Sequence, residues 1–247
     1  MLTGSSPPNR SADVRDRPVA LVTGSRRGIG RHIAGHLVAR GYSVVGCSPH
    51  TADWELEGYE HEVADVGSEE HVVALLRGIR KRHGGLSVLV NNAGAASMNH
   101  VLTTPGETVE RIVRTNLTGT ILVSRESAKL MMPGRWGRIV NLSTIAVPLR
   151  LEGEAIYASA KAGVEVFTRI LARELAPLGI TVNAIGPAPT PTDLTRGVPS
   201  EALEALIGRL AVKRPGTIAD VTNVLDFLLR RESDTVTGQI IYLGGAG

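Results

Sequence analysis

The sequence alternates between short apolar runs rich in β-branched residues and longer stretches in which apolar residues recur every three or four positions. The short runs lie at residues 19–22, 43–47, 88–90, 138–142, 180–185 and 239–243, with a weaker one at 59–63. The helical spacing occurs at 28–40, 68–83, 107–132, 154–177, 200–210 and 217–231. Runs of this kind are typical of strands buried on both faces, and a helix between two strands makes them parallel neighbours. We therefore predict an α/β fold, a doubly wound three-layer sandwich around a seven-stranded parallel sheet.

The same alternation sets the domain organisation. The 247 residues contain 43% hydrophobic side chains, which is enough for the core of one large domain. Residues 18–247 carry the whole pattern, so we predict a single domain there, preceded by a flexible tail at 1–17. The tail lacks the apolar core of a signal peptide, and no run approaches the ~18 apolar residues of a membrane span.

Charge and cysteine content narrow the expected partners and compartment. A net charge of +3 arises from 27 basic and 24 acidic residues without a long basic run. We therefore expect neither a nucleic acid nor a membrane as a partner. The single cysteine, Cys47, cannot form an internal disulfide and lies in an apolar run, which favours a buried thiol in the cytoplasm.

The link between the first strand and the first helix is rich in glycine and reads TGSRRGIG from Thr23 to Gly30. Glycines at such a turn let the backbone approach a pyrophosphate, and the following helix N-terminus attracts its charge. The three residues between the first two glycines differ from the usual G-x-G-x-x-G spacing. The turn residues that we expect at a dinucleotide are Gly24, Arg26, Arg27, Gly28, Ile29 and Gly30. Together with the predicted sheet, this turn indicates a Rossmann-type fold.

The helical stretch at 154–177 carries Tyr157 and Lys161 four residues apart, so their side chains lie on one face of the helix. A phenol has a reference pKa of about 10, and an adjacent ammonium favours the phenolate. Such a pair suits a group that donates a proton and takes it back. The pair alone is equally compatible with an ordinary amphipathic helix, so the other motifs must decide.

Together these motifs resemble those of the short-chain dehydrogenase/reductase family, which combines T-G-x-x-x-G-x-G with Y-x-x-x-K. Further landmarks of that family follow in order, so that the resemblance covers residues 18–247. They are Asp65-Val66 near the adenine, Asn91-Asn92-Ala93-Gly94, Asn116, the segment from Asn183 to Pro187 beside the nicotinamide, Thr237-Gly238-Gln239 and Gly244-Gly245. The resemblance adds Ser48, Asp65, Val66, Asn92, Ala93, Gly94, Pro187, Thr190 and Thr192, with Tyr157 and Lys161, to the expected cofactor contacts.

The resemblance implies an oxidoreductase that transfers hydride between a nicotinamide and a ketone or secondary alcohol. Tyr157 is then the general acid and base, and Lys161 lowers its pKa and binds the nicotinamide ribose. Asn116 holds a water that links Lys161 to solvent. The four-residue interval from Tyr157 to Lys161 sets the chain apart from enoyl reductases of this fold. The chain is most similar to members that resemble 3-oxoacyl-[acyl-carrier-protein] reductases.

A hydroxyl that bonds the substrate oxygen completes the family's site, and here the sequence departs from the pattern. The family places a serine thirteen residues before the tyrosine, whereas this chain has Thr144 there and Ser143 one position earlier. We predict that Thr144 supplies the hydroxyl. Its extra methyl group restricts χ1 and narrows the site. An insertion between 145 and 156 would restore the role to Ser143.

The choice of cofactor depends on the end of the second strand, where a carboxylate would bond the 2′-hydroxyl of NAD(H). Residues 47–50 contain no carboxylate, and Arg26 and Arg27 are positioned for a 2′-phosphate. The sequence therefore favours NADP(H). NAD(H) remains open, since Asp53 or Glu55 could fold back onto the ribose. We expect no metal ion at the site.

The segment at 186–212 is expected to cover the substrate, and it too departs from the family. Ala188 replaces the usual glycine after Pro187, and Thr190 replaces an aliphatic residue. Arg135 and Arg169 are candidates for docking an acidic carrier protein, whereas Arg150 could meet an anionic substrate group. The substrate stays open between an acyl thioester, a free ketone, a secondary alcohol and a polyol. A cofactor-binding scaffold with little turnover is the alternative from another class.

Assembly is the last expectation. Small residues on the helices at 107–132 and 154–177 permit close approach of a second copy, and the resemblance implies a homo-oligomer, a tetramer or a dimer. The alternative is tight packing within one subunit.

Overall fold

The computed structural model describes residues 17–190 and 200–246. Residues 1–16 of the predicted tail and Thr192 lie outside these residues, as does part of the predicted substrate-covering segment. Within the described parts of the chain, no helix is both long enough and apolar enough to cross a membrane.

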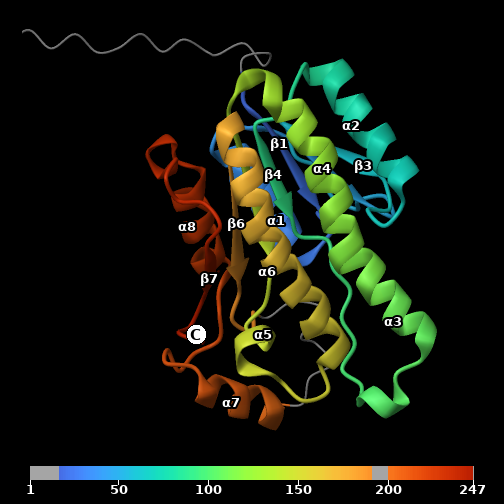
Figure 1. Cartoon of the computed structure of the whole chain (residues 1–247), viewed down its shortest axis with the longest axis vertical. Helices are drawn as coiled ribbons and strands as arrows, with labels where there is room; N and C mark the ends of the chain where they lie inside the picture. The colour runs from blue at the N-terminus through green and yellow to red at the C-terminus, as the bar shows by residue number, and fades with distance from the viewer. Residues whose placement is uncertain (1–16, 191–199, 247) are drawn as a thin grey trace, which may run out of the picture.

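One parallel sheet forms the middle layer of the molecule (Figure 1). Its strands are β1 (Val19–Thr23), β2 (Ser43–Ser48), β3 (Tyr59–Val63), β4 (Val88–Asn91), β5 (Gly137–Leu142), β6 (Ile180–Gly186) and β7 (Ile240–Tyr242). The 7-stranded sheet has the order β3-β2-β1-β4-β5-β6-β7, and every neighbouring pair is parallel. β1, β2 and β4 to β6 are buried along their whole length, which explains their uninterrupted apolar runs.

Helices cover both faces of this sheet. The described helices are α1 (Gly28–Ala39), α2 (Glu69–His83), α3 (Gly106–Val113), α4 (Gly119–Met131), α5 (Ala146–Leu149), α6 (Ala155–Leu175), α7 (Ser200–Arg209) and α8 (Ile218–Leu229). α2, α4 and α6 pack into one core and α1 and α8 into another, each against its own face of the sheet. The predicted Rossmann-type three-layer sandwich is therefore confirmed.

The strand order indicates at which edge of the sheet a ligand would bind. The chain leaves β1 toward β2 on one side, and β4 then starts the other half of the sheet on the opposite side. Loops diverge at this switch point, so ligands of doubly wound sheets bind beyond the carboxyl ends of the central strands. The glycine-rich turn follows β1, and the Asn92 turn follows β4, so both lie at this point.

The predicted helix at 107–132 is interrupted rather than continuous. Residues Arg114–Thr118 form a π-helical segment between α3 and α4. Such a segment inserts one residue into the helical turn and often marks a functional site. The periodicity of the apolar residues did not reveal it, because the flanking turns keep their faces toward the core. The short helix α5 was likewise not predicted from the sequence.

Candidate functional site

The glycine-rich turn after β1 packs too tightly for side chains at two positions. A Cβ atom at Gly30 would lie 2.3 Å from the Gly24 carbonyl oxygen and 2.4 Å from Asn92 Nδ2. Gly24 has a positive φ of 67°, and a Cβ there would lie 2.8 Å from the Ala93 Cα. Gly28 also has a positive φ, of 59°. The turn can therefore bring bare backbone to a phosphate, as the sequence predicted.

The turn after β4 is bonded to the glycine-rich turn. Asn92 Nδ2 donates to the carbonyl oxygens of Thr23 at 2.9 Å and Gly24 at 3.1 Å. The backbone amides of Asn92 and Ala93 both donate to Thr23 Oγ1 at 3.0 Å. Asn92 and Ala93 thus position the two turns relative to each other, a role that is separate from any contact with the cofactor.

The N-terminus of α1 is suited to an anion. Its N-cap residue, Arg27, makes no side-chain capping bond, and the first turn contains no acidic residue. The first amides of a helix without a side-chain cap carry a partial positive charge. Gly28 starts the helix, Ile29 is half-buried, and Arg27 is exposed. These features and the side-chain-free cradle at Gly30 fit the pyrophosphate of a dinucleotide.

The ends of β2 and β3 form a corner of polar and aromatic side chains beside this turn. The Tyr59 hydroxyl hydrogen-bonds Ser25 Oγ at 2.9 Å and His61 Nδ1 at 2.6 Å. Ser48 Oγ donates to the His50 carbonyl oxygen at 2.6 Å and hydrogen-bonds His61 Nε2 at 3.0 Å. Burial raises the pKa of Tyr59 to about 12, so the phenol stays neutral. We call Ser25, Ser48, Trp54, Tyr59 and His61 the ribose corner.

Trp54 extends the ribose corner over the glycine-rich turn. Its ring stacks on Tyr59 with 4.1 Å between centroids, and its Nε1 donates to the Arg26 carbonyl oxygen at 3.1 Å. The guanidinium carbon of Arg31 lies 5.2 Å from the Trp54 ring centroid. An open cavity of about 650 Å³ adjoins these rings and is lined by residues between Thr51 and Val63.

The ribose corner was not predicted from the sequence, apart from Ser48. A signal did exist, because Gly46 interrupts the β-branched run of β2, and glycine within a strand often marks a close approach. A Cβ atom at Gly46 would lie 2.1 Å from Ser25 Oγ and 2.2 Å from the Tyr59 hydroxyl oxygen. The glycine therefore makes room for the contact between these two side chains.

Asp65 and Val66 follow β3, and their side chains contact other residues of the protein. Asp65 Oδ1 accepts from the Gly67 amide at 2.9 Å, and its Oδ2 lies 4.0 Å from Arg114 Nη2. The Val66 side chain is buried and faces Gly119, where a Cβ would lie 2.7 Å from Val66 Cγ2. The side chain of Val66 is thus used for packing against α4.

Tyr157 and Lys161 lie on the buried face of α6 near its N-terminus. Tyr157 is 9% exposed and Lys161 is 3% exposed. Lys161 Nζ donates to the Leu142 carbonyl oxygen at 2.7 Å and lies 6.0 Å from the Tyr157 ring centroid. The predicted pair is therefore brought to the carboxyl end of β5.

Burial decides the protonation of this pair. Desolvation raises the pKa of Tyr157 to about 12, with a further rise from the Glu154 charge and an opposing hydrogen bond from Thr144. Desolvation also lowers the pKa of Lys161 to about 8. The net shift of the Tyr157 pKa is thus upward, whereas the sequence predicted a downward shift. The expectation considered only the neighbouring ammonium, and burial outweighs it.

The two candidate hydroxyls after β5 have different partners. Thr144 is half-buried, and its side chain hydrogen-bonds with Tyr157. Ser143 is buried and donates to Glu165 Oε1 at 2.5 Å. Glu165 Oε2 also accepts from the Tyr242 hydroxyl at 2.7 Å. The Ser143 hydroxyl is therefore engaged with Glu165, and Thr144 is the hydroxyl beside Tyr157. The buried Glu165 was not predicted from the sequence.

Asn116 lies within the π-helical segment and is fully buried. Its Nδ2 donates to the carbonyl oxygens of Ala95 at 2.7 Å and Ile112 at 3.0 Å, and its Oδ1 accepts from the Ala95 amide at 3.2 Å. Gly94 lies between the side chains of Asn116 and Lys161, which were predicted to be linked through a water. A Cβ atom at Gly94 would be 2.8 Å from Asn116 Oδ1 and 3.9 Å from Lys161 Nζ.

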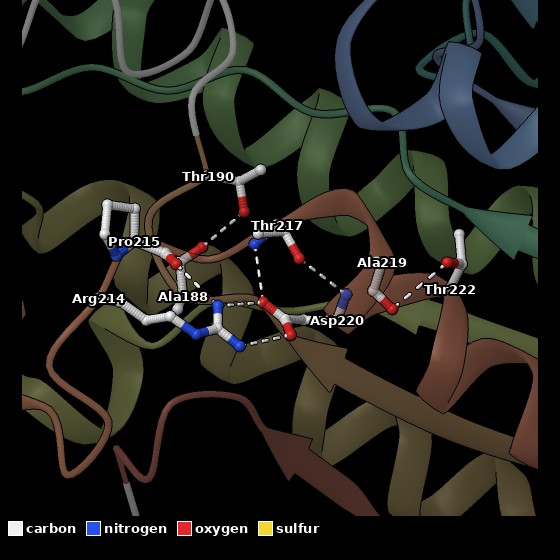
Figure 2. A network of polar contacts seen from close by, with 8 residues as sticks. All are labelled: Ala188, Thr190, Arg214, Pro215, Thr217, Ala219, Asp220 and Thr222. Atoms are coloured by element: carbon white, nitrogen blue, oxygen red, sulfur yellow. Dashed lines mark hydrogen bonds and ion pairs between the residues drawn. The ribbon is translucent and has the colours of Figure 1, made fainter.

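The segment after β6 carries the altered residues of the predicted cover. Thr190 Oγ1 donates to the Ala188 carbonyl oxygen at 3.0 Å, and both residues are buried (Figure 2). Pro187 is half-buried, and the Pro189 carbonyl oxygen accepts from the Gly216 amide at 2.8 Å. Ala188 is not among the described non-glycine residues with positive φ, which are Arg135 and Arg150, so its replacement of glycine causes no backbone strain.

The start of α8 supports this segment through a second network, also drawn in Figure 2. Arg214 pairs with Asp220 through two bonds of 2.7 Å and 2.8 Å. Thr217 and Asp220 form a capping box, which satisfies two amides at the helix N-terminus. The pairing with Arg214 holds the pKa of Asp220 well below its usual range.

The candidate docking arginines do not gather at the site. Arg135 precedes β5 and therefore lies at the amino end of the sheet, where its Nη2 donates to the Pro177 carbonyl oxygen at 2.9 Å. Arg169 is exposed and lies twelve residues after Tyr157, which is about 18 Å along the axis of α6. Of the three arginines considered, only Arg150 lies near the start of α6, and it is exposed.

Fold and site together define a class of protein. A switch-point turn shaped for a dinucleotide, with a buried tyrosine and lysine beside it, is the arrangement of a nicotinamide-dependent oxidoreductase. Comparison with known sequences agrees. Residues 24–245 match the protein-family model described as "Enoyl-(Acyl carrier protein) reductase". The chain is 36% identical to 3-oxoacyl-[acyl-carrier-protein] reductase of Pseudomonas aeruginosa over 92% of this chain and 96% of that protein.

Two further comparisons support the assignment. The 3-oxoacyl-[acyl-carrier-protein] reductase of Vibrio cholerae is 34% identical, again over 92% of this chain and 96% of that protein. The structure of aldohexose dehydrogenase from Thermoplasma acidophilum superposes with a TM-score of 0.85 and 31% identity, covering 94% of each chain. The chain belongs to the short-chain dehydrogenase/reductase family and is an oxidoreductase acting on CH–OH or C=O groups.

Proposed function

We propose that this protein is an NADP(H)-dependent ketone reductase in which Tyr157 is the general acid. The observation that supports this most directly is the placement of Tyr157 and Lys161 on the buried face of α6, beside Thr144 and next to the glycine-rich turn. We place the enzyme in the cytoplasm, where the buried thiol of Cys47 stays reduced.

The residues of the chain divide the work of reduction. A bound nicotinamide supplies the hydride. Tyr157, which is neutral because of its raised pKa, holds the proton that the substrate oxygen takes up. Thr144 hydrogen-bonds the same oxygen, and the Lys161 ammonium stabilises the negative charge left on Tyr157. Asn116, buried beside Gly94, would hold a water that links Lys161 to solvent.

NADP(H) is the proposed cofactor because residues 47–50 at the end of β2 contain no carboxylate; Glu55 and Glu57 line the cavity that adjoins the ribose corner. A carboxylate at the end of β2 would bond the 2′-hydroxyl of NAD(H) and repel a 2′-phosphate. Arg26 and Arg27 in the adjoining turn supply positive charge for that phosphate. The other residues that the sequence analysis predicts to contact the cofactor are proposed to do so as well. They are Gly24, Gly28, Ile29, Gly30, Asp65, Val66, Asn92, Ala93, Gly94, Pro187, Thr190 and Thr192.

The proposed substrate is a ketone, and the sequence relatives favour a 3-oxoacyl thioester. The positions of Arg135 and Arg169 argue against their use in docking a carrier protein. Oxidation of a secondary alcohol or polyol is the second candidate, because the superposed structure is that of an aldohexose dehydrogenase.

A cofactor and substrate panel tests the proposal. Purified protein would be assayed for oxidation of NADPH and NADH with a 3-oxo ester, a 3-oxoacyl thioester and a diketone, and for NADP⁺ reduction with aldohexoses. We expect turnover of the ketones and a KM for NADPH well below that for NADH. Tight cofactor binding without turnover of any compound would favour the scaffold alternative, and a clear NADH preference would overturn the cofactor assignment.

We also propose a homo-oligomer. Apolar side chains on the outer faces of α4 and α6 are exposed to solvent, namely Ile121, Val166 and Ile170. Exposed apolar residues on neighbouring helices are typical of subunit contacts. Light scattering at working concentration should give a mass of two or four chains, and a monomer would refute the assignment.

A further inference from the structure

Glu154 immediately precedes the helix that carries Tyr157, and its side chain does not do what an N-cap side chain usually does. It is the N-cap residue of α6 but accepts no bond from the amides of the first turn. Side chains at this position normally satisfy one of those amides. The carboxylate of Glu154 is therefore not used to cap the helix.

The Glu154 carboxylate has one oxygen without a partner. Oε2 is buried and makes no hydrogen bond within the described part of the chain. A buried charged oxygen without a donor is costly, and native structures rarely leave one outside a functional site. Burial raises the pKa of Glu154, and no cation contributes to that shift.

Glu154 lies close to the reacting group. Glu154 is the N-cap residue of α6 and Tyr157 is the third residue of the helix, two positions whose side chains lie near each other at a helix N-terminus. Its charge is the second-largest cause of the raised pKa of Tyr157, after burial. Glu154 is therefore the charged side chain that acts most strongly on the group that would bond the substrate carbonyl oxygen.

We infer that Glu154 determines substrate specificity by accepting a hydrogen bond from a hydroxyl group on the carbon next to the reacting carbonyl. The inference rests on the proposed ketone reduction and names its substrate class, a neutral α-hydroxy ketone. A carboxylate at that carbon would be repelled by Glu154. An ammonium there would be repelled by the buried Lys161, which lies one helical turn beyond Tyr157.

Three esters that differ at one position test this inference. Ethyl 3-oxobutanoate has no donor, ethyl 4-hydroxy-3-oxobutanoate has the hydroxyl, and ethyl 4-methoxy-3-oxobutanoate keeps the oxygen but removes the donor. Since hydroxyl and methoxy groups activate the ketone similarly, the ratio of their kcat/KM values reports the hydrogen bond. We expect the hydroxy ester to be favoured over the methoxy ester by about tenfold or more, as for a bond to a charged acceptor.

Substitutions assign that preference to Glu154. Glu154→Ala should reduce the hydroxy-to-methoxy ratio to about one, mainly by raising KM for the hydroxy ester, since the bond forms in the bound substrate. Glu154→Gln keeps an acceptor oxygen and should retain part of the preference. Glu152→Gln, at an exposed glutamate two residues earlier, is the matched control and should leave the ratio unchanged.

Each outcome decides between distinct conclusions. Equal kcat/KM values for hydroxy and methoxy esters in the wild type would overturn the role of Glu154 while leaving ketone reduction intact. The same would follow if Glu154→Ala slowed all three esters equally, because that is the effect of a purely structural residue. No turnover of any ester, with cofactor bound, would instead refute the proposed function on which the inference rests.

Discussion

The carboxyl edge of the sheet is built differently at its two ends. Beyond β5, Asn116, Tyr157 and Lys161 are buried, and their polar atoms are held by backbone carbonyls and by Thr144. At the other end, the ribose corner combines the buried Ser25 and Ser48 with the half-buried rings of Trp54, Tyr59 and His61, of which Tyr59 and His61 lie on the edge strand β3. Burial shifts pKa values and fixes geometry, whereas a partly exposed corner can adjust to its ligand. Changes at the first end should therefore alter the rate, and changes at the second should alter cofactor affinity.

The largest expected effect is that of Tyr157→Phe. Removing the only proposed proton donor should lower kcat by about 10³-fold, within the usual range for a general acid. NADPH binding, followed by fluorescence titration, should change little because the ribose corner is untouched. Tyr59→Phe is the matched control and should keep kcat near that of the wild type. Loss of NADPH binding in Tyr157→Phe would show that the residues beyond β5 also determine cofactor affinity, contrary to this division of roles.

The two hydroxyls after β5 provide the next test. Thr144→Ala should lower turnover about 10²-fold, as expected for removal of one oxyanion donor. Ser143→Ala should affect turnover much less, since Ser143 donates to Glu165, and should instead lower the melting temperature. Thr144→Ser should recover most of the activity. The opposite order in steady-state kinetics would assign the role to Ser143.

The pH dependence of reduction should follow Lys161 rather than Tyr157. The amine has a lowered pKa of about 8, so its charged form is lost as the pH rises through 8. The phenol, with a pKa of about 12, remains protonated over this range. We expect kcat/KM for ketone reduction to fall by up to about tenfold per pH unit above 8. A profile that stays flat to pH 10 would show that the charge on Lys161 is not required.

The smallest effect is expected at the ribose corner. Tyr59→Phe removes the hydrogen bonds to Ser25 and His61 while keeping the stacking on Trp54. A net hydrogen bond contributes about 1 kcal/mol, so KM for NADPH should rise by about fivefold with kcat unchanged. A fall in kcat of the same size would mean that the two ends are coupled through the glycine-rich turn.

Much of this arrangement could be predicted from local sequence. The strand runs, the glycine-rich turn and the Tyr157–Lys161 interval depend on residues that are near neighbours in the chain, so their spacing carries the information. The features that were not predicted depend on contacts in space. The contact of Ser143 with Glu165 joins two elements that the periodicity treats separately, and the π-helical segment around Asn116 interrupts a stretch that the periodicity treats as one helix.

The sequence by itself determined the order of strands and helices, the doubly wound topology and the residue types at the switch point, because apolar spacing and glycine positions act locally. Only the tertiary structure decided which hydroxyl faces Tyr157, in which direction burial moves the pKa values of Tyr157 and Lys161, and that Gly46 admits Tyr59 beside Ser25. Desolvation and close packing depend on every neighbour in space, and spacing along the chain does not contain them.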